Sequence, residues 1–261
     1  MDLEAGVAIV TGSSSGVGAA TARRLAEKGC HLVINYAHNE AGARATQAAC
    51  EAFGVETLVM QADVSQDEDC RRMAAEADEK WGRIDALVNN AGTTKFCDHA
   101  DLDGLDAADF LHIYGVNTVG AYQMTRAVVP AMQRGGRGSV VNVASIAGVM
   151  GVGSSIAYAA SKGAMITLGL SLARALGPEI RVNTVCPGFI QGDWLEQGMG
   201  SETYARTKAF LEKNTPLRLT TTPDNIAEAL VYFQGGADVM TGETLLLDGG
   251  HHLTQMPLAR R

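Results

Sequence analysis

The sequence predicts an α/β fold built on a mostly parallel, doubly wound sheet. Three observations carry this prediction: short β-rich apolar runs alternate with helix-length amphipathic segments, a glycine-rich turn follows the first run, and no linker or repeat divides the chain. Regular alternation of strands and helices implies parallel strands joined by right-handed crossovers. We expect a single Rossmann-like sheet of seven strands, and we expect their order to be 3-2-1-4-5-6-7.

Seven apolar runs are expected to form the strands, and several are nearly continuous, as in strands covered on both faces. They are residues 7–12, 31–36, 57–63, 86–92, 139–145, 180–188 and 243–250. The expected helices are 18–28, 40–53, 67–81, 106–132, 156–176 and 224–234. The one long irregular stretch, about 187–223, is weakly helical only around 201–213. Such a segment in a compact domain is often a lid or binding loop, so we expect it to shape a substrate pocket.

Composition limits the class of protein. The chain has 261 residues, 46% of them hydrophobic, which suits one large α/β domain or two small ones. Its net charge of -8 argues against a nucleic-acid surface. The N-terminus lacks the pattern of a secretory signal. No run of about 18 apolar residues occurs, so no membrane span is expected.

The cysteines and histidines do not predict a metal site. The five cysteines are an odd number without a CxxC pair, and no histidine cluster supports them. Reduced thiols in a cytoplasmic protein are therefore expected. Two adjacent histidines near the C-terminus, His251 and His252, are too few ligands for a metal by themselves.

A glycine-rich loop lies between the first expected strand and the first helix. Residues 11–18 read TGSSSGVG, with the spacing G-x-x-x-G-x-G. Glycines allow a tight turn and a close backbone approach to phosphate, and the following helix offers free N–H groups to a pyrophosphate. A purely structural turn is the alternative, but the strand-to-helix context favours a dinucleotide. The candidate contacts are Gly12, Ser14, Ser15, Gly16, Val17 and Gly18.

Tyr158 and Lys162 are four residues apart on an expected helix, which places them on one face. A phenol has an unperturbed pKa of about 10, and a nearby ammonium favours the phenolate and lowers that pKa. Tyr158 can then give a proton to a developing alkoxide or take one from an alcohol. This spacing alone is common on helix surfaces, so the assignment depends on the rest of the site.

Ser145 ends an apolar strand, at the edge of a parallel sheet where ligands bind. Its hydroxyl can donate to a substrate oxygen on which negative charge develops. The alternative is a nucleophilic serine, but the context VASIAG has no G-x-S-x-G elbow. We therefore expect Ser145 to act beside Tyr158 in proton and hydride chemistry.

These motifs together resemble the short-chain dehydrogenase/reductase family, over about residues 5–250. The resemblance rests on TGSSSGVG, Asp63-Val64, Asn89-Asn90-Ala91-Gly92, Asn117, Ser145, Tyr158-x-x-x-Lys162 and Pro187-Gly188. Within the family, the chain looks loosely like 3-oxoacyl carrier-protein reductases and glucose dehydrogenases. The resemblance implies a dinucleotide-binding catalytic domain over residues 1–261, with a substrate loop at about 187–223.

The resemblance also assigns roles that spacing does not give. It implies that Asn117 holds a water in a proton relay and that Lys162 bonds the nicotinamide ribose. It implies that Asp63 contacts the adenine amino group and that Val64 lines the adenine ring. Asn117 otherwise reads as a helix-surface amide, and Asp63 as a helix N-cap.

Two further segments are expected to touch the cofactor. The glycine of Asn90-Ala91-Gly92 permits a close backbone approach, while Asn89 reads as structural. After the sixth strand, a wall for the nicotinamide is implied by the resemblance, formed by Pro187, Gly188 and Ile190. The family commonly has threonine near position 192, where this chain has Gly192.

The choice of nicotinamide cofactor is read from the end of the second strand. An acidic residue there would bond the ribose 2′-hydroxyl and repel a 2′-phosphate. The chain has Asn35 and Tyr36 at this point, and Glu40 comes later. NADP(H) is therefore favoured, with NAD(H) left open because no arginine or lysine occupies 35–39. Either Asn35 or Tyr36 is expected to point at the ribose, because strand side chains alternate faces.

We conclude that the sequence predicts an oxidoreductase that interconverts a ketone and a secondary alcohol. A dehydratase or isomerase on the same fold and a non-catalytic nucleotide sensor remain the alternatives. The expected partner is a small carbonyl or alcohol substrate, with neither nucleic acid nor membrane. The resemblance implies a homotetramer packed through the two long helices and the C-terminal strand region, with a homodimer as the alternative.

Overall fold

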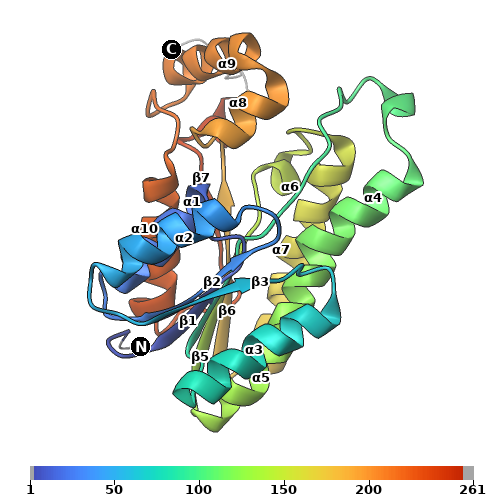
Figure 1. Cartoon of the computed structure of the whole chain (residues 1–261). Helices are drawn as coiled ribbons and strands as arrows, with labels where there is room; N and C mark the ends of the chain where they lie inside the picture. Colours follow the sequence, from blue (N-terminus) through green and yellow to red (C-terminus); the bar gives the residue numbers. More distant parts are fainter. Residues whose placement is uncertain (1–2, 255–261) are drawn as a thin grey trace.

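The computed structural model describes residues 3–254 and contains one seven-stranded parallel sheet (Figure 1). The strands are β1 (Val7–Val10), β2 (His31–Tyr36), β3 (Thr57–Gln61), β4 (Ala86–Asn89), β5 (Gly138–Val143), β6 (Ile180–Pro187) and β7 (Thr244–Leu247). Their order is β3-β2-β1-β4-β5-β6-β7, and every neighbouring pair is parallel. The predicted fold class and strand order are therefore confirmed.

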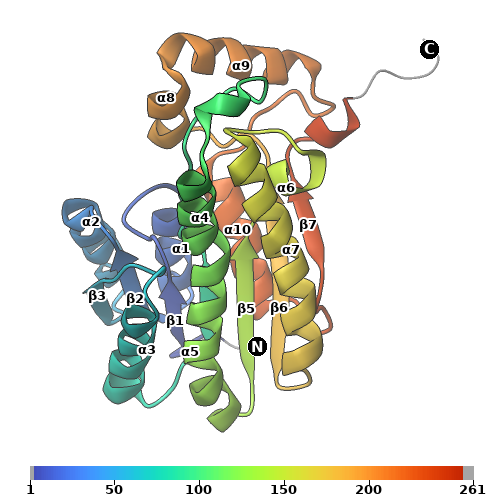
Figure 2. The same ribbon diagram turned by 90° about the vertical axis from the view of Figure 1, so that its right-hand side faces the viewer.

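Helices cover both faces of the sheet (Figures 1 and 2). One face is covered by α1 (Gly16–Ala26), α2 (Glu40–Glu51) and α10 (Pro223–Gly235). The other is covered by α3 (Asp67–Trp81), α5 (Gly120–Arg134) and α7 (Ile156–Leu176). The bounds of α3 and α7 are those expected, α1 and α10 differ from expectation by one or two residues at each end, and α2 begins as expected and ends two residues early.

The core follows the alternation of side chains along each strand. In β1, Ala8 and Val10 join the apolar cluster under α1, α2 and α10, whereas Ile9 joins the cluster on the opposite face. In β2, Leu32 and Val33 are divided between the same two clusters. Both faces of the central strands are buried, which is why their sequences are almost continuously apolar.

The expected helix 106–132 is a continuous helical run with an irregular turn inside it. It comprises α4 (Ala107–Tyr114), the π-helical turn η2 (Gly115–Val119) and α5. Asp106 caps its beginning by accepting from the backbone N–H of Asp109 (2.9 Å). A π-helical turn adds a residue to a helix and is frequent at functional sites. The prediction of one regular helix is wrong at this turn.

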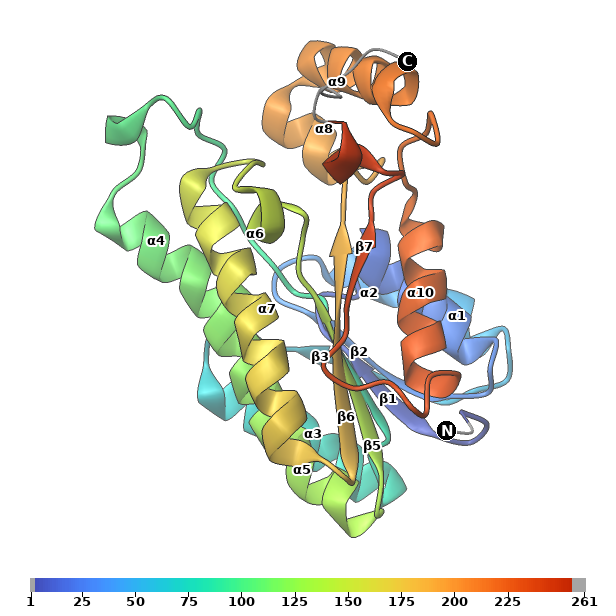
Figure 3. The same cartoon turned by 180° about the vertical axis from the view of Figure 1, so that it is seen from behind.

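The stretch 187–223 forms two helices above the carboxyl ends of the strands, α8 (Asp193–Met199) and α9 (Ser201–Asn214) (Figure 3). The weakly helical region expected around 201–213 is confirmed as α9. The helix α8 is missing from the sequence prediction because it is short and lies between Gly192 (φ 146°) and Gly200 (φ 81°). Only glycine adopts such backbone angles readily, and glycine weakens a helical pattern.

One helix within 3–254, α7, is long and apolar enough to cross a membrane by length and composition alone. In the fold it packs against β6, against α4 and against the short helix α6 (Ala147–Met150). Its small, buried residues include Ala157, Ala159 and Gly169. Of the apolar stretch of α7, 39% is buried inside the domain.

Candidate functional site

The glycine loop between β1 and α1 has the backbone that a phosphate cradle requires. Gly12 and Gly16 have positive φ angles of 61° and 53°. A Cβ on Gly18 would lie 2.4 Å from the carbonyl oxygen of Gly12, so no side chain fits there. The N-cap Ser15 makes no capping bond, and the first turn of α1 has no acidic residue. Its N–H groups therefore face a site that suits a pyrophosphate.

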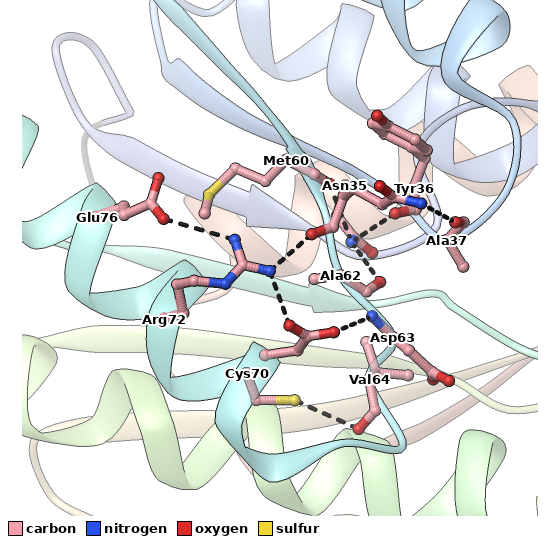
Figure 4. A network of polar contacts seen from close by, with 12 residues as sticks. Asn35, Tyr36, Ala37, Met60, Ala62, Asp63, Val64, Cys70, Arg72 and Glu76 are labelled. Carbon is pink, nitrogen blue, oxygen red and sulfur yellow. Dashed lines mark hydrogen bonds and ion pairs between the residues drawn. The ribbon is translucent and has the colours of Figure 1, made fainter.

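Asn35 supports this loop from behind instead of facing a ribose. Its side chain is 1% exposed, and its Oδ1 accepts a hydrogen bond from the backbone N–H of Gly12 (2.9 Å). Its Nδ2 donates to the carbonyl oxygen of Ala62 (3.0 Å), as Figure 4 shows. The expectation that the Asn35 side chain points at the ribose is wrong, because this carboxamide is committed to the backbone of two loops. Tyr36 is buried in the core cluster that includes α1.

Asn90 holds the same loop from the end of β4. Its Nδ2 donates to the carbonyl oxygens of Thr11 (2.9 Å) and Gly12 (3.0 Å). The hydroxyl of Thr11 accepts hydrogen bonds from the backbone N–H groups of Asn90 and Ala91, both at 3.0 Å. The first and fourth strands are thus locked together at the edge where a dinucleotide would lie.

Asp63 lies exposed after β3, with its backbone fixed by α3. Its N–H donates to Asp69 (2.8 Å), and Asp69 accepts from the guanidinium of Arg72 (2.7 Å). The same guanidinium donates to the carbonyl oxygen of Gln61 (2.7 Å), so it spans the turn (Figure 4). One carboxylate oxygen of Asp63 accepts from the N–H of Ser65 (2.9 Å). The helix N-cap is Gln66, so the N-cap reading of Asp63 is wrong.

Val64 is buried and lies beside α5. A small hollow is lined by its side chain together with Thr11, Ala91 and Val116. A Cβ on Gly120 would lie 2.7 Å from the Val64 side chain, so α5 approaches this residue closely. The structure therefore brings together Val64, the glycine loop and the end of β4, three segments that were expected to meet the same cofactor.

Ser145, Tyr158 and Lys162 meet at the carboxyl end of β5. The Ser145 hydroxyl accepts from the N–H of Ala147 (3.1 Å) and bonds to Tyr158. The Lys162 ammonium lies 5.6 Å from the centre of the Tyr158 ring and donates to the carbonyl oxygen of Val143 (2.8 Å). The one-turn spacing on α7 thus places phenol and ammonium side by side, as the sequence indicates.

Burial sets the protonation of these groups. It raises the pKa of Tyr158 to about 12, and the hydrogen bond with Ser145 opposes that rise only in part. Burial also lowers the pKa of Lys162 to about 8, because this residue is only 3% exposed. The expectation that Lys162 brings the pKa of Tyr158 below its ordinary value is wrong for the chain itself. Tyr158 is protonated at neutral pH.

Asn117 lies in the π-helical turn and is fully buried, so it is not a helix-surface amide. Its Nδ2 donates to the carbonyl oxygen of Thr93 (3.0 Å) and to the hydroxyl of Ser161 (2.9 Å). Its Oδ1 accepts from the N–H of Thr93 (2.7 Å). A Cβ on Gly92 would lie 3.3 Å from Asn117 Oδ1 and 3.5 Å from Lys162 Nζ. The absence of a side chain at Gly92 therefore keeps the space beside Lys162 open.

The segment after β6 forms one wall of the site. The N–H of Gly188 donates to the carbonyl oxygen of Leu247 (2.9 Å) on β7. A Cβ on Gly188 would lie 2.6 Å from that of Asp248, so glycine is required at this close approach. Ile190 pairs with Thr221 in an isolated parallel bridge. Residues from Pro187 to Ile190 are thus held in place from two sides.

Three aromatic residues over the site were missed from sequence. Trp194 on α8 lies with its ring centre 6.2 Å from that of Tyr158, and Phe96 lies 5.8 Å from Trp194. The hydroxyl of Tyr204 on α9 accepts from the N–H of Gly192 (3.2 Å). The available signal was the group of four aromatic residues in the expected substrate loop, Phe189, Trp194, Tyr204 and Phe210.

The histidines near the C-terminus have a different environment. The ring of His252 bonds to the carboxylate of Asp248 (2.8 Å), and Asp248 is itself buried. Across residues 3–254, no group of three or more His, Cys, Asp or Glu side chains has the arrangement of a metal site.

Comparison with known proteins gives the same assignment from sequence and from structure. A family described as enoyl-(acyl carrier protein) reductase matches residues 12–252. A ketoacyl reductase named for the granaticin polyketide synthase of Streptomyces violaceoruber is 43% identical over 96% of this chain and 97% of its own. A short-chain dehydrogenase/reductase structure from Burkholderia xenovorans is 40% identical, with a TM-score of 0.88 over 95% of this chain and 98% of its own.

A second solved structure is named as NAD⁺-bound xylitol dehydrogenase. It is 28% identical, with a TM-score of 0.86 over 96% of this chain and all of its own. These relatives are named for reactions on carbonyl and alcohol groups, and they match almost the full chain. This chain therefore belongs to the short-chain dehydrogenase/reductase family and is an NAD(P)(H)-dependent oxidoreductase that interconverts a carbonyl group and a secondary alcohol.

Proposed function

We propose that the chain acts as one catalytic domain in which Tyr158 transfers the proton of the reaction. The observation that carries this proposal is the meeting of Ser145, Tyr158 and Lys162 beside an open glycine loop. A nicotinamide bound there supplies or accepts the hydride. The segment 187–223, which contains α8 and α9, forms the substrate loop.

Tyr158 is the general acid when a carbonyl is reduced. Its raised pKa keeps the phenol protonated at neutral pH, so a proton is available for the oxygen of the developing alkoxide. The hydroxyl of Ser145 donates to the same oxygen and stabilises its charge. In the reverse direction, Tyr158 first has to give up its own proton, and its phenolate then takes the proton from the alcohol.

Lys162 and Asn117 supply the route by which Tyr158 regains its proton. The pKa of Lys162, about 8, lets this group give and take protons near neutral pH. Both polar atoms of the Asn117 side chain are bonded to Thr93, so they are not available to the proposed water. We therefore assign this water to the backbone carbonyl of Asn117, which lies in the π-helical turn. Lys162 would also hold the nicotinamide ribose when the cofactor is bound.

The proposed cofactor contacts come from the segments that follow β1, β3, β4 and β6, and from α7. They are Gly12, Ser14, Ser15, Gly16, Val17, Gly18, Asp63, Val64, Asn90, Ala91, Gly92, Tyr158, Lys162, Pro187, Gly188 and Ile190. Asn35 is assigned to supporting Gly12 from behind. Tyr36 is kept among the proposed contacts because it is the last residue of β2, the strand end at which we expect the ribose.

NADP(H) is the cofactor we favour. The first carboxylate after β2 is that of Glu40, and it is paired with Arg44 on the next turn of α2 (3.2 Å). No acidic side chain therefore stands at the end of β2 to repel a 2′-phosphate. The ratio of kcat/KM for NADPH and NADH tests this preference.

We also propose that the enzyme assembles as a homotetramer in the cytoplasm. Several large apolar side chains lie exposed on α4, α5, α7 and β7, as a surface for a second copy would require. They are Phe110, Leu111, Tyr114, Tyr122, Leu170 and Leu245. Cys50, Cys70, Cys97 and Cys186 are free thiols, as expected in the cytoplasm. Light scattering on the purified protein distinguishes tetramer from dimer.

The activity itself is tested by following the absorbance of reduced nicotinamide with ketones, secondary alcohols and sugars. Substrate-dependent oxidation of NADPH, lost in Tyr158→Phe, is the expected result. Tight cofactor binding without turnover of any substrate would favour the nucleotide sensor. Conversion of a substrate without net change in cofactor absorbance would favour a dehydratase or isomerase.

A further inference from the structure

The rings of three aromatic residues follow one another above the reaction site. They come from three different elements: Tyr158 from α7, Trp194 from α8 and Phe96 from the segment after β4. The ring centres of Trp194 and Tyr158 are 6.2 Å apart with the planes tilted by 47°, and those of Trp194 and Phe96 are 5.8 Å apart with a tilt of 56°. Of these three rings, only that of Tyr158 carries a group that the proposed chemistry uses. The rings of Trp194 and Phe96 therefore have no role in proton transfer.

The position of Trp194 is fixed by how α8 fits the segment beneath it. Gly198 is four residues from Trp194 and therefore lies on the same face of α8. A Cβ on Gly198 would lie 1.9 Å from the Phe96 ring, so the ring packs directly on the helix backbone. The segment beneath is anchored in turn, because the N–H of Cys97 donates to the carbonyl oxygen of Ser154 (2.9 Å).

The indole nevertheless remains half exposed. Trp194 is 50% exposed, although it lies against the catalytic tyrosine. A large aromatic surface beside a reaction centre gains free energy when a flat apolar molecule covers it. The exposed face of Trp194 is therefore suited to hold the substrate while the substrate carbonyl meets Tyr158.

Charges around the rings disfavour an anionic substrate. The helix α8 carries Asp193 and Glu196 and no basic residue in its last turn. The ammonium of Lys95, next to Phe96, is paired with Asp109 (2.6 Å). A carboxylate or phosphate near Trp194 would meet like charges and no unpaired cation from this segment or from α8.

We propose that Trp194 determines substrate choice, and that the ketone stands on an uncharged, flat cyclic or aromatic framework. The framework lies on the exposed face of the indole, and its carbonyl oxygen reaches Tyr158. Phe96 is the positioning residue that holds the indole in place. This inference rests on the proposed role of Tyr158 as the proton donor.

The kinetic test compares α-tetralone, a flat bicyclic ketone, with ethyl acetoacetate, a small acyclic one. In Trp194→Ala, KM for α-tetralone should rise about tenfold, equivalent to about 1.4 kcal/mol, with kcat nearly unchanged. Kinetics with ethyl acetoacetate should stay within about twofold of the wild type. Trp194→Phe should restore most of the loss, because it returns an aromatic face. Equal effects on both ketones would overturn the inference.

Phe210→Ala is the matched control. Phe210 is an exposed aromatic residue on the neighbouring α9, with 62% of its surface accessible. Its removal should leave KM for both ketones unchanged. A rise in KM for α-tetralone equal to that in Trp194→Ala would show that general apolar surface, not this indole, binds the ring, and would contradict the inference.

A binding test separates this inference from the proposed reaction. The chain has two tryptophans, and Trp81 lies at the end of α3, at the opposite edge of the sheet. In Trp81→Phe, indole fluorescence therefore reports on Trp194 alone. Saturable quenching by α-tetralone but not by ethyl acetoacetate is expected, and its absence would overturn the inference. A Tyr158→Phe enzyme that still reduced α-tetralone would overturn the proposed role of Tyr158, leaving the quenching result to decide the role of Trp194.

Discussion

The side-chain oxygen of Asn35 accepts a hydrogen bond from the backbone N–H of Gly12, at 2.9 Å. The same carboxamide donates to the carbonyl oxygen of Ala62 (3.0 Å). It thereby fixes the glycine loop against the end of β3. An amide is the side chain that offers both a donor and an acceptor to two backbones at once.

Asn35→Asp should destabilise the protein and leave its cofactor preference unchanged. The substitution removes the donor to Ala62 and places a buried carboxylate against a carbonyl oxygen. We expect a loss of at least about 2 kcal/mol in the free energy of unfolding, measured by urea denaturation. The ratio of kcat/KM for NADPH and NADH should stay close to that of the wild type. A tenfold shift towards NADH would return Asn35 to the ribose site.

Asn39→Asp should move the preference towards NADH without loss of stability. Asn39 is exposed and caps α2 by accepting from the N–H of Gly42 (2.9 Å), and aspartate caps a helix equally well. The backbone at Gly42 lies close to the carbonyl of Ser14, so this cap adjoins the phosphate loop. An added charge there should repel a 2′-phosphate and lower kcat/KM for NADPH about tenfold, or about 1.4 kcal/mol. An unchanged ratio would place the 2′-phosphate elsewhere.

Tyr158→Phe should remove most turnover while cofactor affinity changes by no more than a few-fold. The substitution deletes one hydroxyl, and general acid–base steps typically contribute about 100- to 10,000-fold. Turnover is measured with the ketone that the wild type reduces best, and cofactor affinity by fluorescence titration. Tyr232→Phe, on the exposed surface of α10, is the matched control. A Tyr158→Phe enzyme that kept most of its activity would remove this residue from the mechanism.

Lys162→Met should change how stability depends on pH. Burial lowers the lysine pKa from 10.5 to about 8 in the folded chain. Between these pH values the unfolded chain binds the extra proton, so the free energy of unfolding rises with pH, and that gain is lost as pH falls to 8. The variant should lack this rise, so its stability relative to the wild type should fall between pH 8 and 10.5. Stability curves that run parallel for the two proteins would show that burial does not lower the pKa of Lys162.

Arg72→Met should weaken cofactor binding, because Arg72 holds the turn that carries Asp63. The guanidinium donates to Asp69 and to the carbonyl of Gln61, both at 2.7 Å. We expect Kd for the cofactor to rise several-fold, with kcat at saturating cofactor within about twofold. Arg71→Met is the control, since Arg71 bonds only to Asp67 on the outer side of α3 among the contacts that the structure gives it. An equal rise in Kd in both variants would show that the loss of a positive charge on α3, and not the loss of the Arg72 contacts, weakens cofactor binding.

The central strands were predictable because both of their faces are buried, so nearly continuous apolar runs mark β1, β2, β4 and β5. The meeting of Tyr158 and Lys162 was predictable from one helical turn. The role of Asn35 was not predictable. Alternation along a strand gives the direction of a side chain, but it does not give the backbone groups to which that side chain bonds. The exposed indole of Trp194 was not predictable either, since its contact with Tyr158 depends on how α8 docks on the rest of the chain.

The π-helical turn at Gly115–Val119 amounts to a one-residue insertion in a helix that otherwise runs from Ala107 to Arg134. Each residue advances an α-helix by about 100°, so the insertion sets the phase of α4 relative to α5. Deleting one residue here would keep the composition nearly intact but would turn every side chain of α4 away from its present neighbours. The alignment of Asn117 with Thr93 and Ser161 is thus a matter of residue count as much as residue identity.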